Sequence, residues 1–151
     1  MNTRAIIAKE IGHGYFTSWC WIDKEPATIG NILRKYFSSE EEVDEILKYR
    51  NILGIFDDYR NDITPSMPGK YSRLSNGFYI KYDDGKSVVV SGGLNGFFRT
   101  IHDMLNEDIR SLYIFSPKTK EWLFYRNKQN TPSDQLDQAG MNANLFVFFV
   151  V

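Results

Sequence analysis

The chain has 151 residues and a formal net charge of −1, from 18 basic and 19 acidic residues. This length fits a single domain, residues 1–151, which can bury a core without disulfides or metals. The balanced charge argues against nucleic acid as the partner, because a dedicated nucleic-acid binder usually carries a basic excess.

Cysteine and histidine are scarce: the chain has only Cys20, His13 and His102. One cysteine cannot form an intramolecular disulfide, which favours a reducing compartment, and these three side chains cannot build the usual cysteine-rich zinc site. We therefore expect no metal and no cofactor. The N-terminus lacks a signal-peptide pattern, and the longest apolar run, Leu145–Val151, is too short to span a bilayer. We expect a cytoplasmic protein, in a cell or an infected host, with no membrane contact.

The first elements in the chain form a predicted β-hairpin. Residues 3–9 and 15–22 are typical of strands, and Gly12-His13-Gly14 is typical of a turn because glycine permits positive φ.

Two helices follow. Apolar residues at helical spacing predict a helix over 27–37. Ser39 and Glu42 have the spacing of a capping box, which predicts a second helix over 40–49. Residues 52–56 continue the apolar signal and are interpreted as a short helical turn.

The second half predicts two more hairpins and a third helix. Asp83-Asp84-Gly85-Lys86 separates strands over 78–82 and 87–90, and Asp-Gly favours a type I′ turn. A helix is predicted over 95–106, and a further hairpin pairs 112–115 with 122–125.

The last residues combine a long loop with an apolar strand. Residues 127–144 are polar and predict a loop, whereas Leu145–Val151 has no polar alternation. We expect that strand inside the sheet, or paired with a second copy in a homodimer. The pattern as a whole predicts an α+β fold: a mainly antiparallel sheet built from hairpins, packed with about three amphipathic helices.

Part of the chain resembles a loose family of small phage and bacterial proteins. The resemblance covers about the first 55 residues and, weakly, 110–126. It rests on these segments: Asn2-Thr3-Arg4, Cys20–Pro26, Gly30–Leu33, the acidic helix near Glu42-Val43, Tyr113–Phe115 and Glu121-Trp122. The family pattern opens Ser-Thr-Arg and continues with Cys-His-Trp-Asp-Gly-Tyr-Pro.

The chain departs from that pattern within its second segment. Cys20, Asp23 and Pro26 are kept, but Trp21 stands where the pattern has histidine, and Lys24-Glu25 where it has Gly-Tyr. A site that relied on the histidine would be absent here. The resemblance implies a phage or mobile-element accessory protein that binds a host factor, such as a counter-defence inhibitor.

One catalytic arrangement can be considered, with Cys20 as nucleophile, His13 as base and Asp23 as orienting group. Cys20 lies in the middle of a predicted strand, which favours a packed thiol over an activated one. We assign no catalytic residue.

A glycine-rich turn before the predicted third helix is the best candidate ligand site. Backbone amides at a helix N-terminus can bind phosphate or another small anion. The spacing matches neither the dinucleotide-binding nor the P-loop pattern, and a tight turn is the favoured alternative. The candidate ligand residues are Ser91, Gly92, Gly93, Asn95, Gly96 and Arg99.

Aromatic side chains define a candidate interaction surface. Tyr15, Trp19 and Trp21 share one face of a predicted strand, and Asp23 follows it. Core packing is the simplest role for that face. An exposed face of this kind would be the natural centre of a protein interface, because Trp and Tyr dominate interface hot spots.

Two charged segments have simpler explanations. The acidic run over 40–45 can imitate DNA phosphates, but a solvated first helical turn explains it. The basic residues around Trp122 and Tyr125 suit single-stranded nucleic acid, but an ordinary hairpin explains them on a chain of balanced charge.

Three functions remain open. We favour a non-catalytic accessory protein that binds a host protein. The first alternative is a protein that sequesters a nucleotide or another small molecule through the glycine-rich turn. The second is a small cysteine- or carboxylate-dependent enzyme.

Overall fold

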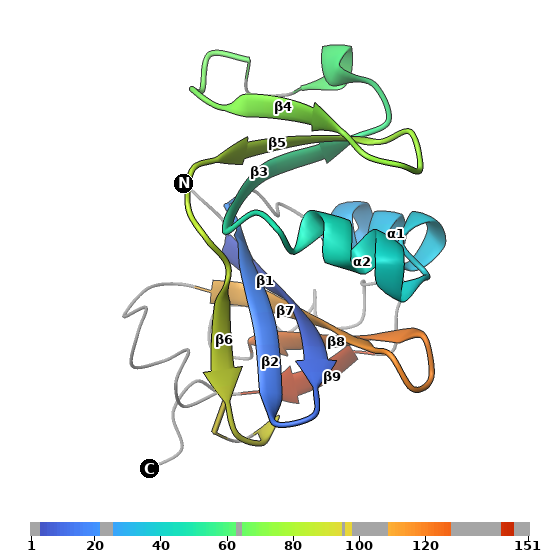
Figure 1. Ribbon diagram of the computed structural model, residues 1–151, viewed down its shortest axis with the longest axis vertical. Coiled ribbons are helices and arrows are strands. Elements are labelled where there is room, and N and C mark those ends of the chain that lie inside the picture. The colour runs from blue at the N-terminus through green and yellow to red at the C-terminus, as the bar shows by residue number, and fades with distance from the viewer. Residues whose placement is uncertain are drawn as a thin grey trace.

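The computed structural model describes residues 4–21, 26–62, 65–94, 96–97, 109–127 and 143–146. These residues form nine strands, two α-helices and one 3₁₀ helix. The strands run in the order β4-β5-β3-β2-β1-β7-β8-β9, and β6 also pairs with β2. Figure 1 shows β3, β4 and β5 at one end of the molecule, with α1 and α2 beside the strands. The bounds are β1 Arg4–Ile11, β2 Gly14–Cys20, α1 Pro26–Tyr36, α2 Glu40–Ile46, β3 Asn51–Phe56, η1 Tyr59–Asn61, β4 Lys70–Arg73, β5 Tyr79–Asp83, β6 Val88–Ser91, β7 Ile109–Ser116, β8 Glu121–Asn127 and β9 Ala143–Phe146.

The N-terminal hairpin is confirmed. β1 and β2 pair antiparallel from Ala5–Cys20 to Ile11–Gly14. Gly14 also pairs with Ser91 of β6, and a Cβ atom at Gly14 would lie 2.3 Å from the carbonyl oxygen of Val90. The close approach of β6 to β2 therefore requires glycine at this position.

The expectation of a mainly antiparallel sheet is wrong, because the sheet is mixed. The pairs β1–β7, β2–β3 and β8–β9 are parallel. A short turn can join only antiparallel neighbours, whereas parallel neighbours need a crossover. Both α-helices lie in the crossover from β2 to β3. The hairpins predict the antiparallel pairs, but sequence-distant strands complete the sheet.

The predicted hairpin across Asp83–Lys86 is also wrong. β5 pairs with β3 and β4, whereas β6 pairs with β2. A type I′ turn needs positive φ at both Asp84 and Gly85, but Asp84 has no positive φ, and Gly85 has φ +142° instead of about +90°. After the Asp83–Lys86 segment the chain therefore enters β6, which pairs with β2 and not with β5. The hairpin between β7 and β8 is confirmed.

Residues 52–56 belong to strand β3 and not to a helical turn. Four consecutive residues, 52–55, are buried, as in a strand covered on both faces. Gly54 leaves room for the ring of Phe56, which would lie 2.3 Å from a Cβ atom there.

Both N-terminal helices are confirmed. The capping box forms as predicted, with the Ser39 hydroxyl accepting from the Glu42 amide and the Glu42 carboxylate accepting from the Ser39 amide. The expectation of about three helices is not met, since the described residues contain two α-helices. Of the helix predicted over 95–106, only residues 96–97 lie within the described part.

The sheet buries apolar side chains on both faces. On one face the larger core includes Ile7, Leu33, Phe37, Ile46 and Phe124, and α1 and α2 cover it. The indole of Trp122 donates a 2.8 Å hydrogen bond to the carbonyl of Phe37, which ties β8 to the residue after α1.

The opposite face carries a smaller core that includes Ile6, Tyr15, Phe97, Leu112 and Ile114. Alternate residues of β1 therefore serve different cores, as the period of two along a strand dictates.

The C-terminal strand begins two residues earlier than predicted. β9 spans 143–146 and pairs in parallel with β8 at the end of the strand order. Residues 128–142 and 147–151, which hold most of the predicted loop and strand, lie outside the described residues. No helix in the described part of the chain is long and apolar enough to cross a membrane.

Candidate interaction surface

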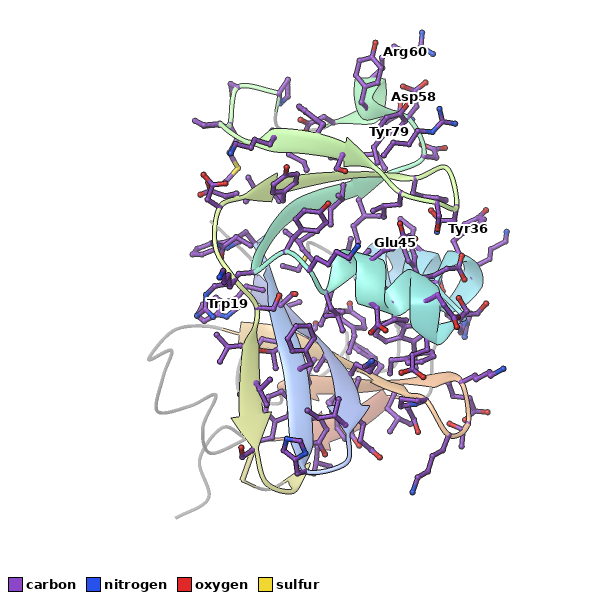
Figure 2. All side chains as sticks on the ribbon, viewed as in Figure 1. Trp19, Tyr36, Glu45, Asp58, Arg60 and Tyr79 are labelled. Carbon is purple, nitrogen blue, oxygen red and sulfur yellow. The ribbon has the colours of Figure 1, made fainter. Side chains whose placement is uncertain are left out.

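Trp19 and Trp21 lie on one face of the chain at the end of β2. Their rings stack with centroids 5.9 Å apart, and both side chains are half-buried. The guanidinium of Arg50 lies 5.3 Å from the ring centroid of Trp19, within the range of a cation–π contact. Figure 2 shows Trp19 at the left side of the molecule, below β3, β4 and β5.

Parallel pairing of β2 with β3 creates this arrangement. The amide of Trp19 donates to the carbonyl of Arg50 at 2.6 Å, and the amide of Trp21 donates to the carbonyl of Ile52 at 2.9 Å. Residues about 30 positions apart in the chain are thereby held side by side.

Polar contacts position the second indole. The Nε1–H of Trp21 donates to Oδ1 of Asn51 at 2.9 Å, and Nδ2 of Asn51 donates to the carbonyl of Asp84 at 3.3 Å. The carboxylate of Asp84 accepts from Nζ of Lys70 at 2.9 Å. These links connect the indole to two other strands, so it is held in place before any partner arrives.

Of the four predicted surface residues, the structure brings together Trp19 and Trp21. Tyr15 is buried and stacks on Phe97 at 4.4 Å, so it belongs to the smaller core. Burial raises the pKa of Tyr15, and the Glu10 carboxylate raises it further. Asp23 lies outside the described residues.

Arg50 and Asn51 are the members of this surface that sequence reasoning missed. Arg50 immediately precedes β3 and Asn51 begins it, just after the segment for which the sequence predicts a helix over 40–49. No local pattern pairs them with the tryptophans, because the contact depends on strand order. We name the group Trp19, Trp21, Arg50 and Asn51 the tryptophan surface.

A second aromatic group lies at the end of the molecule that β3, β4 and β5 form. Tyr59 is 55% exposed and meets Tyr79 edge-on at 5.8 Å, and the guanidinium of Arg73 lies 5.8 Å from the Tyr79 ring centroid. Figure 2 shows Arg60, Asp58 and Tyr79 at this end. The side-chain hydrogen bond from Arg60 lowers the pKa of Asp58.

The considered catalytic arrangement does not assemble. Cys20 is fully buried at one end of β2, whereas His13 is exposed in the turn before that strand. Seven residues of extended chain separate them by about 23 Å. Burial in the larger core fits the packing role of Cys20.

The glycine-rich turn is exposed at Ser91, Gly92, Gly93 and Gly96, while Asn95 and Arg99 lie outside the described residues. Gly92 has φ +107°, and its amide donates to the carbonyl of His13 at 3.0 Å. A Cβ atom at Gly92, Gly93 or Gly96 would meet nothing within 4 Å. The turn explains the positive φ of Gly92. No atoms surround Gly92, Gly93 or Gly96 closely enough to enclose a ligand.

The acidic run of α2 is largely engaged within the protein. Glu40 and Asp44 accept from Lys9, and Glu42 takes part in the capping box. Glu45 accepts from the amide and the hydroxyl of Ser75. These contacts explain the acidic residues without a DNA-mimicking role.

The basic hairpin likewise offers no aromatic platform at Trp122, which is 8% exposed and bonded to Phe37. Lys118 and Lys120 are exposed in the turn that joins β7 and β8.

The described residues contain no cluster of three or more histidine, cysteine or acidic side chains that could hold a metal ion. No protein-family model, curated protein or solved structure matches the chain.

Proposed function

We propose that this chain is a non-catalytic binding protein that recognises another protein through the tryptophan surface. The observation that carries the proposal is the stacked pair of Trp19 and Trp21 with the Arg50 guanidinium over it. Tryptophan and arginine are the residue types most enriched among interface hot spots.

The rigidity of the surface supports this role. Binding costs less when interface side chains are already ordered. Asn51 holds the Trp21 indole, and backbone hydrogen bonds fix both tryptophans to the neighbouring strand. Trp19 also packs against the smaller core, which gives the surface a firm base.

The resemblance to small phage and bacterial proteins supports a context for this binding. We infer an accessory protein of a phage or mobile element whose partner is a host protein, such as a defence effector. Phage origin and counter-defence rest on the resemblance alone.

Affinity purification with the full chain as bait tests the proposal. We expect a stoichiometric partner from bacterial lysate, and we expect the purified partner to bind the wild-type chain directly in calorimetry. Arg50→Glu and Trp19→Ala should each weaken that binding by about thirtyfold or more, as truncation of a hot spot does.

Arg60→Glu is the matched control, because it reverses an exposed arginine at the far end of the molecule. Circular dichroism must show that each variant is folded. Failure to recover a stoichiometric partner under several conditions would contradict the proposal. So would a partner whose affinity is the same for wild type, Arg50→Glu and Trp19→Ala.

A further inference from the structure

The Arg50 side chain is packed along its stem and at its head, yet its charge has no acidic partner. The guanidinium carbon lies 5.3 Å from the ring centroid of Trp19. The stem passes Gly85 closely: a Cβ atom at Gly85 would lie 3.2 Å from Cβ and 3.3 Å from Cδ of Arg50. Within the described part of the chain, the guanidinium makes no ion pair and no hydrogen bond.

The indole N–H of Trp19 is a second unused donor on the tryptophan surface. The Nε1–H of Trp21 donates to Asn51, whereas that of Trp19 donates to no atom of the described residues. Buried side-chain nitrogen and oxygen atoms rarely lack a partner. In the described residues one such atom is found, Oγ of Ser111. Nε1 of Trp19 and the guanidinium nitrogens of Arg50 are therefore accessible to solvent.

Both unused groups donate hydrogen bonds and neither can accept one. The surface therefore suits a group rich in acceptors. The planar N–H groups of a guanidinium match a carboxylate, which can accept two parallel hydrogen bonds. The stacked rings of Trp19 and Trp21 lie beside this donor group and are half-buried, so their exposed parts offer apolar contact.

The charges near Arg50 limit how negative the partner can be. Asp83 is exposed and pairs with Asn51 across β5 and β3, and Asp84 follows it. Lys70 balances Asp84 but not Asp83. A single carboxylate can meet Arg50, whereas nucleic acid would also bring further phosphates toward these aspartates. The net charge of −1 offers no basic excess to offset that repulsion.

We propose that the tryptophan surface recognises an acidic side chain of its protein partner, flanked by apolar residues. The partner carboxylate accepts from the Arg50 guanidinium, and another oxygen of the same segment accepts from Nε1–H of Trp19. The flanking apolar side chains cover the exposed parts of the two indole rings. This inference rests on the proposed function and names the chemistry of the segment that binds.

Blocked tripeptides that differ in one side chain test the site without the natural partner. The probes are acetyl-Leu-Glu-Leu-amide and its counterparts with Gln or Lys at the centre, titrated into the full chain. Acetate and a short deoxythymidine oligonucleotide are the other probes. The readout is the indole N–H NMR signals of Trp19 and Trp21. We expect saturable millimolar binding of the Glu peptide, about fivefold or more tighter than that of every other probe.

Variants of the chain locate the binding. Arg50→Gln should weaken binding of the Glu peptide by about fivefold or more and leave the Gln peptide unchanged. Arg50→Lys should lie between wild type and Arg50→Gln, because lysine keeps the charge but lacks the planar fork. Trp19→Phe should also weaken binding, observed at Trp21. Arg60→Gln changes an exposed arginine at the end formed by β3, β4 and β5 and should have no effect. Dispersed backbone amide signals must show that each variant is folded.

Any of three results would overturn the inference. The first is the absence of saturable shifts with the Glu peptide. The second is equal or tighter binding of the Gln peptide, the Lys peptide, acetate or the oligonucleotide. The third is a loss in Arg50→Gln no larger than that in Arg60→Gln.

These failures are distinguishable from failure of the proposed function. A partner recovered from lysate whose binding Trp19→Ala weakens would leave the proposed function standing while the acidic segment is rejected. Failure to recover any partner would count against the proposed function whatever the peptides show.

Discussion

Nζ of Lys81 lies 2.8 Å from Oδ2 of Asp62, with the two side chains only 1% and 4% exposed. The hydroxyl of Tyr71 also donates to Oδ2 of Asp62, and the Lys81 ammonium lies 5.6 Å from the Tyr71 ring centroid. Lys81 belongs to β5 and Tyr71 to β4, whereas Asp62 follows η1. This buried ion pair therefore fastens the segment after η1 to the end of the sheet.

Removing one partner of this pair should destabilise the protein strongly. Lys81→Met and Asp62→Asn each leave the other group buried without its main partner, at a cost of about 3–5 kcal/mol in the free energy of unfolding. Urea denaturation measures the loss. The double variant Lys81→Met/Asp62→Asn should lose less than the sum of the single losses, because no uncompensated charge remains.

The pair between Lys70 and Asp84 is the control for that experiment. It has a similar distance, 2.9 Å, but both side chains are largely exposed. Lys70→Met should change stability little. Additive losses at Lys81 and Asp62, or an equal loss at Lys70, would contradict the role we assign to burial.

The raised pKa of Lys9 predicts that the protein loses stability at alkaline pH. Burial alone would lower its pKa, but hydrogen bonds and charge attraction from Asp44 and Glu40 outweigh burial, so its pKa is raised. A raised folded-state pKa gives a stabilisation that is complete below the unfolded value, about 10.4, and is lost as pH rises through the folded value.

Thermal unfolding between pH 9 and pH 12 tests this prediction. Tyr15 and Tyr125 also have raised pKa values and act in the same direction, so the comparison must be between variants. Lys9→Met should flatten the alkaline loss, whereas Lys118→Met should retain it. Identical pH profiles for wild type and Lys9→Met would refute the prediction.

Gly14 should tolerate no side chain. A Cβ atom there would lie 2.3 Å from the Val90 carbonyl oxygen, a backbone atom, so β6 would have to move. We expect Gly14→Ala to lower the free energy of unfolding by about 1–3 kcal/mol, a typical cost of overpacking. Gly12→Ala, where a Cβ atom meets nothing within 4 Å, should cost clearly less. Equal losses in guanidinium denaturation would show that β6 does not approach β2 this closely.

Substitutions at Gly92 and Gly93 test whether the glycine-rich segment is a structural turn or a ligand site. Gly92→Ala should cost about 1–3 kcal/mol because φ +107° is rare for a residue with a side chain. Gly93 has no positive φ and open space around it, so Gly93→Val should leave stability nearly unchanged. A thermal-shift screen with mono- and cyclic nucleotides completes the test. A nucleotide shift in wild type that Gly93→Val abolishes would favour the sequestering function over the turn.

Local sequence signals predicted the elements that local contacts make. The capping box of Ser39 and Glu42 joins residues three positions apart, and the hairpins β1–β2 and β7–β8 close through short turns. The Asp83–Lys86 segment has an equally strong turn pattern, yet β6 pairs with β2 instead of β5. A turn motif defines which backbone conformations a few residues can adopt. Burial of the flanking strands selects the strand with which each one pairs.

The sequence by itself determined the sheet-rich α+β class, the two helices, the capping box of the second helix and the packed character of Cys20. Only the tertiary structure decided that Arg50 lies on Trp19, that Tyr15 is core, and that Lys81 is buried against Asp62. The physical reason is distance along the chain. The periodicity of helices and strands reflects residues that are close in the sequence. Parallel strand pairing and the burial of charged groups depend on which distant segments bury their apolar faces together.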